Sequence, residues 1–188
     1  MRFSSILLIL VLQFFASIAI ADAGNDVEDA QFRLDELFDQ LHEADIEDYY
    51  AFEQEIIEIW GHSGSAAMDL LLERGQIAMA EMDYPKAIEH LSALIDHAPD
   101  FAEGWNARAT VYYLIDEYAL SISDVRQTLI LNPRHFGALN GLGLMFEELG
   151  YLKGAYKAYS MARDLHPYLQ NVNEALIALQ AEIDGVEL

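Results

Sequence analysis

The sequence predicts an all-α protein built from stacked helical hairpins. Three prolines, Pro99, Pro133 and Pro167, recur at an interval of 34 residues. Each follows an apolar stretch with helical periodicity, and small residues recur in step with the prolines. A constant period of this length indicates an array in which one supersecondary unit is used several times.

Each unit carries small side chains at two fixed positions. Counted so that the proline is its 32nd residue, the units begin at residues 68, 102 and 136. A small side chain lets two antiparallel helices cross closely, and larger apolar side chains fill the space beside the crossing. The small residues are Gly75, Ala109 and Gly143 at position 8, and Ala87, Ser121 and Ala155 at position 20.

Turn chemistry divides each unit into two helices. The segments MDYP, IDEY and LGYL lie near the middle of the units, and Asp83, Asp116 and Gly150 suit these breaks. Pro85 suits the first turn of a following helix, where its missing N–H costs little. The first helices (A helices) are expected near 68–81, 102–115 and 136–149, and the second (B helices) near 85–97, 118–131 and 152–165.

This pattern resembles the tetratricopeptide repeat. The best matches are Trp105 with Tyr112, the stretch GLGLMF at 141–146, and the LG-Y-LKGAYKAYSMA pattern across 149–162. Arg74 and Arg108 depart from the family at a position that is usually apolar. The resemblance covers three units, 66–169, and implies a right-handed α-solenoid whose A helices line a concave groove.

The resemblance also implies which residues line this partner groove. No basic residue occupies the implied positions, whereas one subfamily uses lysines and arginines there to clamp the C-terminal carboxylate of a partner. We therefore expect a protein or peptide partner with a neutral or basic extended segment, contacted by Leu72, Met79, Tyr113 and Leu144. These positions could instead contact the N-terminal part of the chain or a second copy, so self-association stays open. The implied lining is Asp69, Leu72, Gln76, Met79, Glu103, Asn106, Thr110, Tyr113, Gly137, Asn140, Leu144 and Glu147.

The first 21 residues have the layout of a secretory signal peptide. Arg2 precedes an apolar stretch over 6–20, and small residues follow, with cleavage fitting after Ala21 or Ala23. A membrane anchor is the alternative, but a span needs about 20 apolar residues, and Gln13 and Ser17 interrupt this shorter run. We expect a secreted protein, most simply periplasmic, with no stable membrane insertion after cleavage.

Helical segments flank the repeats on both sides. Two amphipathic stretches within 22–65 predict an acidic helical hairpin and a linker. Whether this hairpin is a degenerate repeat stays open, and we expect it to pack on the first A helix. Between Asp22 and Trp60 there are 14 acidic residues and one basic residue, Arg33. These carboxylates form either a solvated face or a docking surface for a basic partner. A stripe of Leu169, Val172, Leu176 and Leu179 predicts a C-terminal capping helix within 170–188.

Composition and motifs argue against most other classes of function. The formal net charge of −22 disfavours nucleic acid, and the absence of cysteine removes disulfides, thiolate metal sites and a lipidated cysteine. No metal, calcium or phosphate motif is present, so no cofactor is expected. His62 beside Ser63 and Ser65 would suit a hydrolase, but it lies in a glycine-serine linker without a nucleophile elbow.

These observations predict a non-catalytic scaffold or adaptor in the bacterial cell envelope that binds another protein in its groove. An accessory subunit or chaperone-like component of an envelope assembly is the alternative. A hydrolase acting through His62 is the third.

Overall fold

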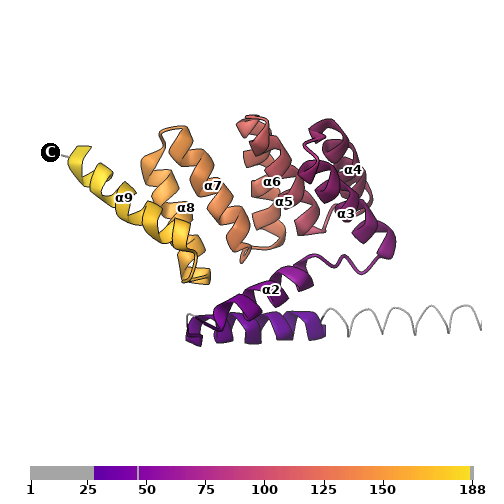
Figure 1. The fold of residues 1–188 in the computed structure, drawn as a ribbon, viewed down its shortest axis with the longest axis horizontal. Coiled ribbons are helices and arrows are strands. Elements are labelled where there is room, and N and C mark those ends of the chain that lie inside the picture. The colour runs from indigo at the N-terminus through magenta and orange to yellow at the C-terminus, as the bar shows by residue number, and fades with distance from the viewer. Residues whose placement is uncertain (1–27, 46, 187–188) are drawn as a thin grey trace, which may run out of the picture.

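The computed structural model describes residues 28–45 and 47–186. In this part of the chain every regular element is a helix, and the helices form a solenoid, as the period predicted (Figure 1). The predicted signal peptide and both cleavage sites lie outside the described residues. Among the described helices, none combines the length and apolarity that crossing a bilayer requires.

Three helical hairpins form the array. They are α3 (Ala66–Ala80) with α4 (Tyr84–His97), α5 (Ala102–Leu114) with α6 (Tyr118–Leu131), and α7 (Phe136–Glu148) with α8 (Leu152–Leu165). Helix α9 (Gln170–Val186) follows as the predicted cap and packs its Val172, Leu176 and Leu179 on the third unit. In Figure 1 the row runs from α3 and α4 on the right to α9 on the left.

The small residues lie at helix crossings, as expected. A Cβ atom placed on Gly75 would lie 2.6 Å from Leu91, and one on Gly143 would lie 2.5 Å from the ring of Tyr159. In the middle unit the Ser121 hydroxyl donates a hydrogen bond of 2.7 Å to the Ala109 carbonyl across the same crossing. The space that a side chain would fill is therefore occupied by the partner helix.

The turn inside each unit uses one left-handed residue at the same position. Met82, Asp116 and Gly150 have φ values of 62°, 61° and 75°. The sequence indicated Asp116 and Gly150 but named Asp83 in the first unit, because a methionine rarely adopts this conformation. Asp83 instead caps α4, where its carboxylate accepts a hydrogen bond from the Lys86 N–H.

The N-terminal hairpin consists of a helix over 28–43 and α2 (Tyr49–Trp60), and it lies along the lower edge of the array in Figure 1. Its Leu34, Leu37, Phe38, Leu41 and Ile56 form one buried cluster with Phe136 at the start of α7. The expectation that this hairpin packs on the first A helix is therefore wrong. Its apolar face instead packs on aromatic residues that the junctions between units supply.

Aromatic and polar contacts fix the hairpin in this place. The ring of Trp60 stacks on His135 at 4.5 Å, and Tyr49 stacks on Tyr168 at 4.7 Å with an interplanar angle of 9°. The Tyr168 hydroxyl donates to the Ala44 carbonyl. These contacts join the beginning of the described chain to the junctions that precede α7 and α9.

Charged groups strengthen the same interface. Arg134 forms an ion pair of 2.7 Å with Asp35 and lies over the Phe38 ring at 4.6 Å. His166 is fully buried beside Glu53, with 3.3 Å between Nε2 and Oε1. Burial lowers the pKa of His166, because the charged imidazolium loses its hydration, and the Glu53 carboxylate opposes this shift.

Candidate functional site

The A helices α5 and α7 form the walls of a pocket of about 280 Å³. Six of the predicted groove residues lie together around it. Ala109, Ala138 and Met145 from the walls, with Ser121 and Val125 from α6, form a largely apolar floor. The six are Asn106, Thr110, Tyr113, Gly137, Asn140 and Leu144.

Two glycines keep the pocket open. Gly137 and Gly141 lie one turn apart on α7, and a Cβ atom on Gly141 would meet nothing within 4 Å. A larger side chain at this position would project into the space between α5 and α7. Gly141 was not among the predicted groove residues, although its spacing of four from Gly137 places both glycines on one helix face.

Two asparagine side chains face the pocket from opposite walls. The Asn106 amide N–H group donates to Glu103 at 3.3 Å, and the Asn140 amide oxygen accepts from Asn171 at 3.1 Å. Among the described residues, the side-chain oxygen of Asn106 accepts no hydrogen bond and the side-chain N–H group of Asn140 donates none. One acceptor and one donor therefore remain, and this is the pair that an extended peptide backbone needs.

The carboxylates of Glu103 and Glu148 bond to the pocket residues Asn106 and Tyr113, and among the described residues no basic side chain lines the pocket. The Tyr113 hydroxyl donates a 2.7 Å hydrogen bond to Glu148, and this bond raises the pKa of Tyr113. The hydroxyls of Tyr118 and Tyr113 together lower the pKa of the Glu148 carboxyl. Glu148 is therefore ionised at neutral pH and adds negative potential beside the Tyr113 ring.

The predicted lining of the first unit lies elsewhere. Leu72 is only 4% exposed and packs in the core with Leu91 and Val111, so its assignment as a contact for a partner is wrong. The second unit covers Leu72. Asn106 and Asn140, which occupy the same position in the second and third units, stay partly accessible. Met79 packs against the same core as a half-buried residue, and Gln76 is exposed outside the pocket.

The remaining predicted residues have structural partners. Asp69 accepts hydrogen bonds from the Ser63 N–H at 2.8 Å and the Ser63 hydroxyl at 2.6 Å, which fixes the linker before α3. Glu103 accepts from His135 at 3.0 Å, so it joins the start of α5 to the start of α7. Glu147 accepts from the buried Tyr159 hydroxyl at 3.0 Å.

The linker histidine is not coupled to a serine among the described residues. His62 lies 2.7 Å from the Glu58 carbonyl through Nδ1, and the Ser63 hydroxyl donates to Asp69. A serine nucleophile needs a base within hydrogen-bond reach, and this arrangement does not supply one. The geometry favours a role of Ser63 and Asp69 in ending the linker.

Comparison with known proteins identifies the class of the fold. A tetratricopeptide repeat family model matches residues 72–127 and 116–169. A TPR repeat-containing protein of Rhizobium etli is 34% identical over 167 residues, which are 88% of this chain and 82% of that protein. The chain belongs to the tetratricopeptide repeat family.

Solved structures agree on the fold. The Sgt2 TPR domain of Aspergillus fumigatus aligns with a TM-score of 0.61 at 22% identity, over 65% of this chain and 83% of that one. The first TPR of Spaghetti (RPAP3), bound to the HSP90 peptide SRMEEVD, aligns with a TM-score of 0.60 at 22% identity, over 62% and 93%. At this identity the likeness shows the helical arrangement alone.

Proposed function

We propose that this protein is a non-catalytic interaction scaffold that binds an extended segment of a partner protein between α5 and α7. The observation that supports this most directly is the pocket with two asparagines on facing helices and an apolar floor. Tetratricopeptide repeat domains such as the first TPR of Spaghetti bind a peptide. The same kind of ligand fits this pocket, because an extended backbone satisfies one donor and one acceptor per residue.

The partner segment is neutral or basic. The peptide SRMEEVD, held by the first TPR of Spaghetti, carries three carboxylate side chains. Among the described residues no Lys or Arg side chain lines this pocket to pair with such groups, whereas Glu103 and Glu148 bond to its residues Asn106 and Tyr113. An acidic segment would be repelled here, and like charges at an interface disfavour wrong partners strongly.

The place of action proposed is the cell envelope. The support is the sequence of residues 1–23, with one positive charge, an apolar stretch and small residues. Fractionation of the native host, followed by N-terminal sequencing of the protein, tests this. A start at Asp22 or Gly24 is expected, and a protein that retains Met1 in the cytoplasm would contradict the proposal.

The ligand preference can be measured with synthetic peptides of matched length. Neutral, basic and acidic extended peptides that carry one fluorophore are titrated with the purified protein, and anisotropy gives each Kd. The acidic series should bind at least about tenfold more weakly than the basic series.

Variants then locate the site. Asn106→Ala and Tyr113→Ala should each weaken binding of the best peptide by about tenfold or more, because each removes a contact at the centre of the pocket. Gln40→Ala, which removes an exposed amide on the N-terminal hairpin, is the matched control. Unchanged affinity in both pocket variants would show that the peptide binds on another face.

A further inference from the structure

The α3–α4 end of the array exposes a face that is buried in every other unit. Ile77 occupies the tenth position of the first unit and is 50% exposed. Its equivalents Val111, Met145 and Leu179 are 0%, 1% and 1% exposed. Val111 packs with Leu91 of the first unit. In the same way, Met145 packs against the second unit. Among the described residues no preceding helix covers Ile77, because the N-terminal hairpin lies along another edge of the array.

The same face has positive charges that pair with no carboxylate in the part of the chain that the structure describes. In the middle unit Arg108 pairs with Asp124 at 2.7 Å and donates to Ser92 of the preceding helix at 3.1 Å. In the first unit the equivalent arginine is Arg74, but His90 replaces the aspartate.

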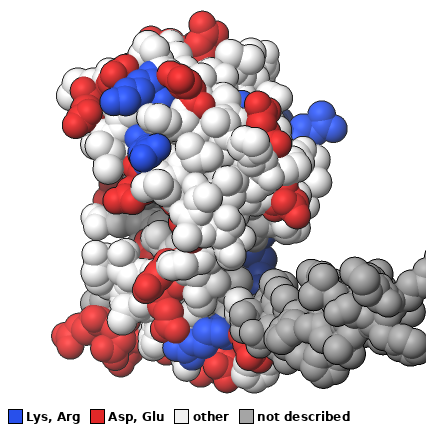
Figure 2. Space-filling view, turned by 90° about the vertical axis from the view of Figure 1, so that its right-hand side faces the viewer, with Lys and Arg blue, Asp and Glu red and all other residues white. Residues whose placement is uncertain are grey.

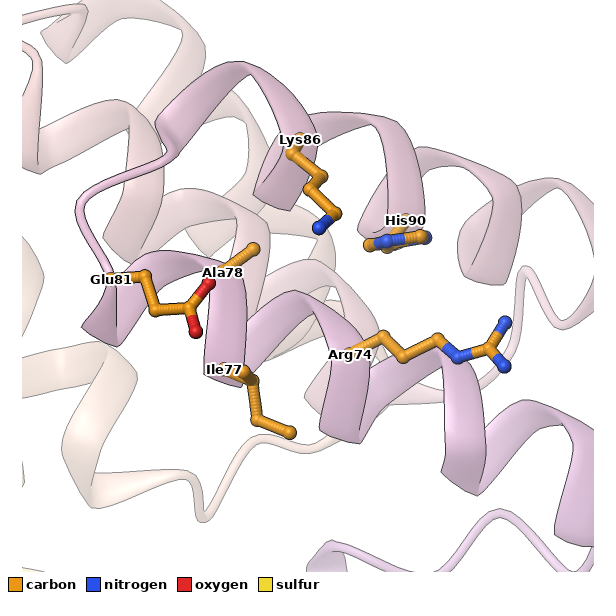
Figure 3. Close-up of a pocket in the computed structure, with 6 residues that line it drawn as sticks. All are labelled: Arg74, Ile77, Ala78, Glu81, Lys86 and His90. Atoms are coloured by element: carbon orange, nitrogen blue, oxygen red, sulfur yellow. The ribbon is translucent and has the colours of Figure 1, made fainter.

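Arg74, Lys86 and His90 line an open pocket of about 300 Å³ at this end, and Figure 3 shows their side chains between α3 and α4. Glu81 also lines it, yet among the described residues none of the four forms an ion pair. Figure 2, which views the molecule from this end, shows basic and acidic groups interspersed around a broad uncharged surface. We call Arg74, Ile77, Lys86 and His90 the head face.

The other end of the array carries complementary features. Helix α9 takes the place of an A helix in a fourth unit, but no B helix follows it among the described residues. Ile177 therefore stands where Gly75, Ala109 and Gly143 stand in the other units, and it is 75% exposed.

Glu174, Ala181 and Asp184 are exposed at the helical spacing that places them on the same side of α9 as Ile177. Helix α9 contains no Lys or Arg. We call Glu174, Ile177, Ala181 and Asp184 the tail face. It combines an exposed apolar centre with carboxylates, as the head face combines an apolar centre with cations.

We propose that copies of this chain stack head to tail, with the tail face of one copy covering the head face of the next. Ile177 then packs against Ile77, and the α9 carboxylates neutralise Arg74 and Lys86, as Asp124 neutralises Arg108 inside the array. The two faces differ, so the contact is heterologous and extends the solenoid in one direction. The pocket between α5 and α7 belongs to neither face, so this inference is independent of the proposed partner groove.

Overall charge limits the strength of this stacking. Copies with a formal net charge of −22 repel each other at long range. At physiological ionic strength this repulsion is screened beyond about 8 Å, whereas the paired groups at the contact are closer than that. We therefore expect short, concentration-dependent oligomers with a Kd below about 1 mM rather than a permanent filament.

Complementary variants test the direction of stacking. The protein produced from the full coding sequence is studied by sedimentation equilibrium up to about 1 mM, the range of the expected Kd. Ile77→Glu blocks the head face and Ile177→Lys blocks the tail face. Each variant alone should remain monomeric, while an equimolar mixture should form heterodimers and nothing larger, because one intact head face and one intact tail face remain. Ile130→Lys, at a residue 61% exposed on α6, should assemble like the unchanged protein.

Disulfide trapping gives a second measurement that does not depend on the stability of the charged variants. The chain has no cysteine, so Ile77→Cys and Ile177→Cys introduce single thiols. Mild oxidation should link the two variants to each other much faster than either to itself. A monomeric unchanged protein at all concentrations, oligomers that persist in either blocked variant, or equal cross-linking in all combinations would each overturn the proposal.

Discussion

The crossing of α7 and α8 offers the sharpest test of how the units pack. Gly143 faces the ring of Tyr159, which is fully buried and whose hydroxyl donates to Glu147. A Cβ atom on Gly143 would lie 2.5 Å from Cδ1 and Cε1 of this ring and 2.9 Å from Cγ. Because the ring is fixed by packing and by its hydroxyl, Gly143→Ala forces the two helices apart. Gly141→Ala, on the same helix, meets nothing within 4 Å and is the matched control.

The expected magnitudes follow from two opposing effects. Replacing glycine by alanine inside a helix stabilises it by about 1 kcal/mol at either position. Overpacking a dense core costs about 1–3 kcal/mol, and three ring atoms closer than 3.0 Å place Gly143→Ala near the upper value. Gly143→Ala should therefore lower the free energy of unfolding by about 2 kcal/mol, whereas Gly141→Ala should raise it by about 1 kcal/mol.

Thermal unfolding followed by circular dichroism measures the difference. For a chain of this size 1 kcal/mol corresponds to about 2–4 °C in Tm, so Gly143→Ala should melt roughly 4–8 °C lower and Gly141→Ala roughly 2–4 °C higher. If both variants shift Tm by the same amount and in the same direction, the close approach of α7 and α8 at Gly143 does not control stability.

Two further perturbations test the polar contacts. Asp124→Ala leaves the guanidinium of Arg108, whose side chain is 16% exposed, without its carboxylate, so urea unfolding should show a loss of about 3 kcal/mol. Replacing Arg108 and Asp124 together by leucine should recover most of this loss, and an equal loss in the double variant would refute the explanation. Both ring nitrogens of His42 face carbonyl oxygens, those of Phe38 and Asp164, and these bonds raise the pKa of His42 because only the imidazolium donates to both. The stabilisation is therefore present below about pH 6.5 and is lost as pH rises through the folded-state pKa, so the stability difference between the unchanged protein and His42→Gln should shrink from about pH 6 to about pH 8; a growing difference would contradict it.

Much of the array could be predicted from the sequence, because stacked units repeat the same local constraints. The positions of Pro99, Pro133 and Pro167 predicted where units end, and the observed helix bounds lie within two residues of the expected ones. The left-handed Met82 could not be predicted, since nothing in its type favours that conformation and the repeat alone imposes it.

Contacts outside the repeat had no such signal. The hairpin contacts join residues far apart in sequence, as from Ala44 to Tyr168, and these have no period that a single sequence would reveal. For the groove, the repeat positions predicted that Asn106 and Asn140 lie near each other, and both line one pocket, but their contact with a partner stays a prediction. The groove prediction was wrong at Leu72, because burial by the next unit, rather than the position within its own helix, decides what that side chain contacts.

The position of the N-terminal hairpin has a consequence for the order in which this protein forms during its synthesis. Leu37 and Leu41 are made early, but Phe136, which completes their cluster, is made about a hundred residues later. At ribosomal rates of about 5–20 residues per second, these leucines wait for several seconds without the surface that buries them. The N-terminal hairpin is thus made before the repeats but is among the last segments to reach its final place.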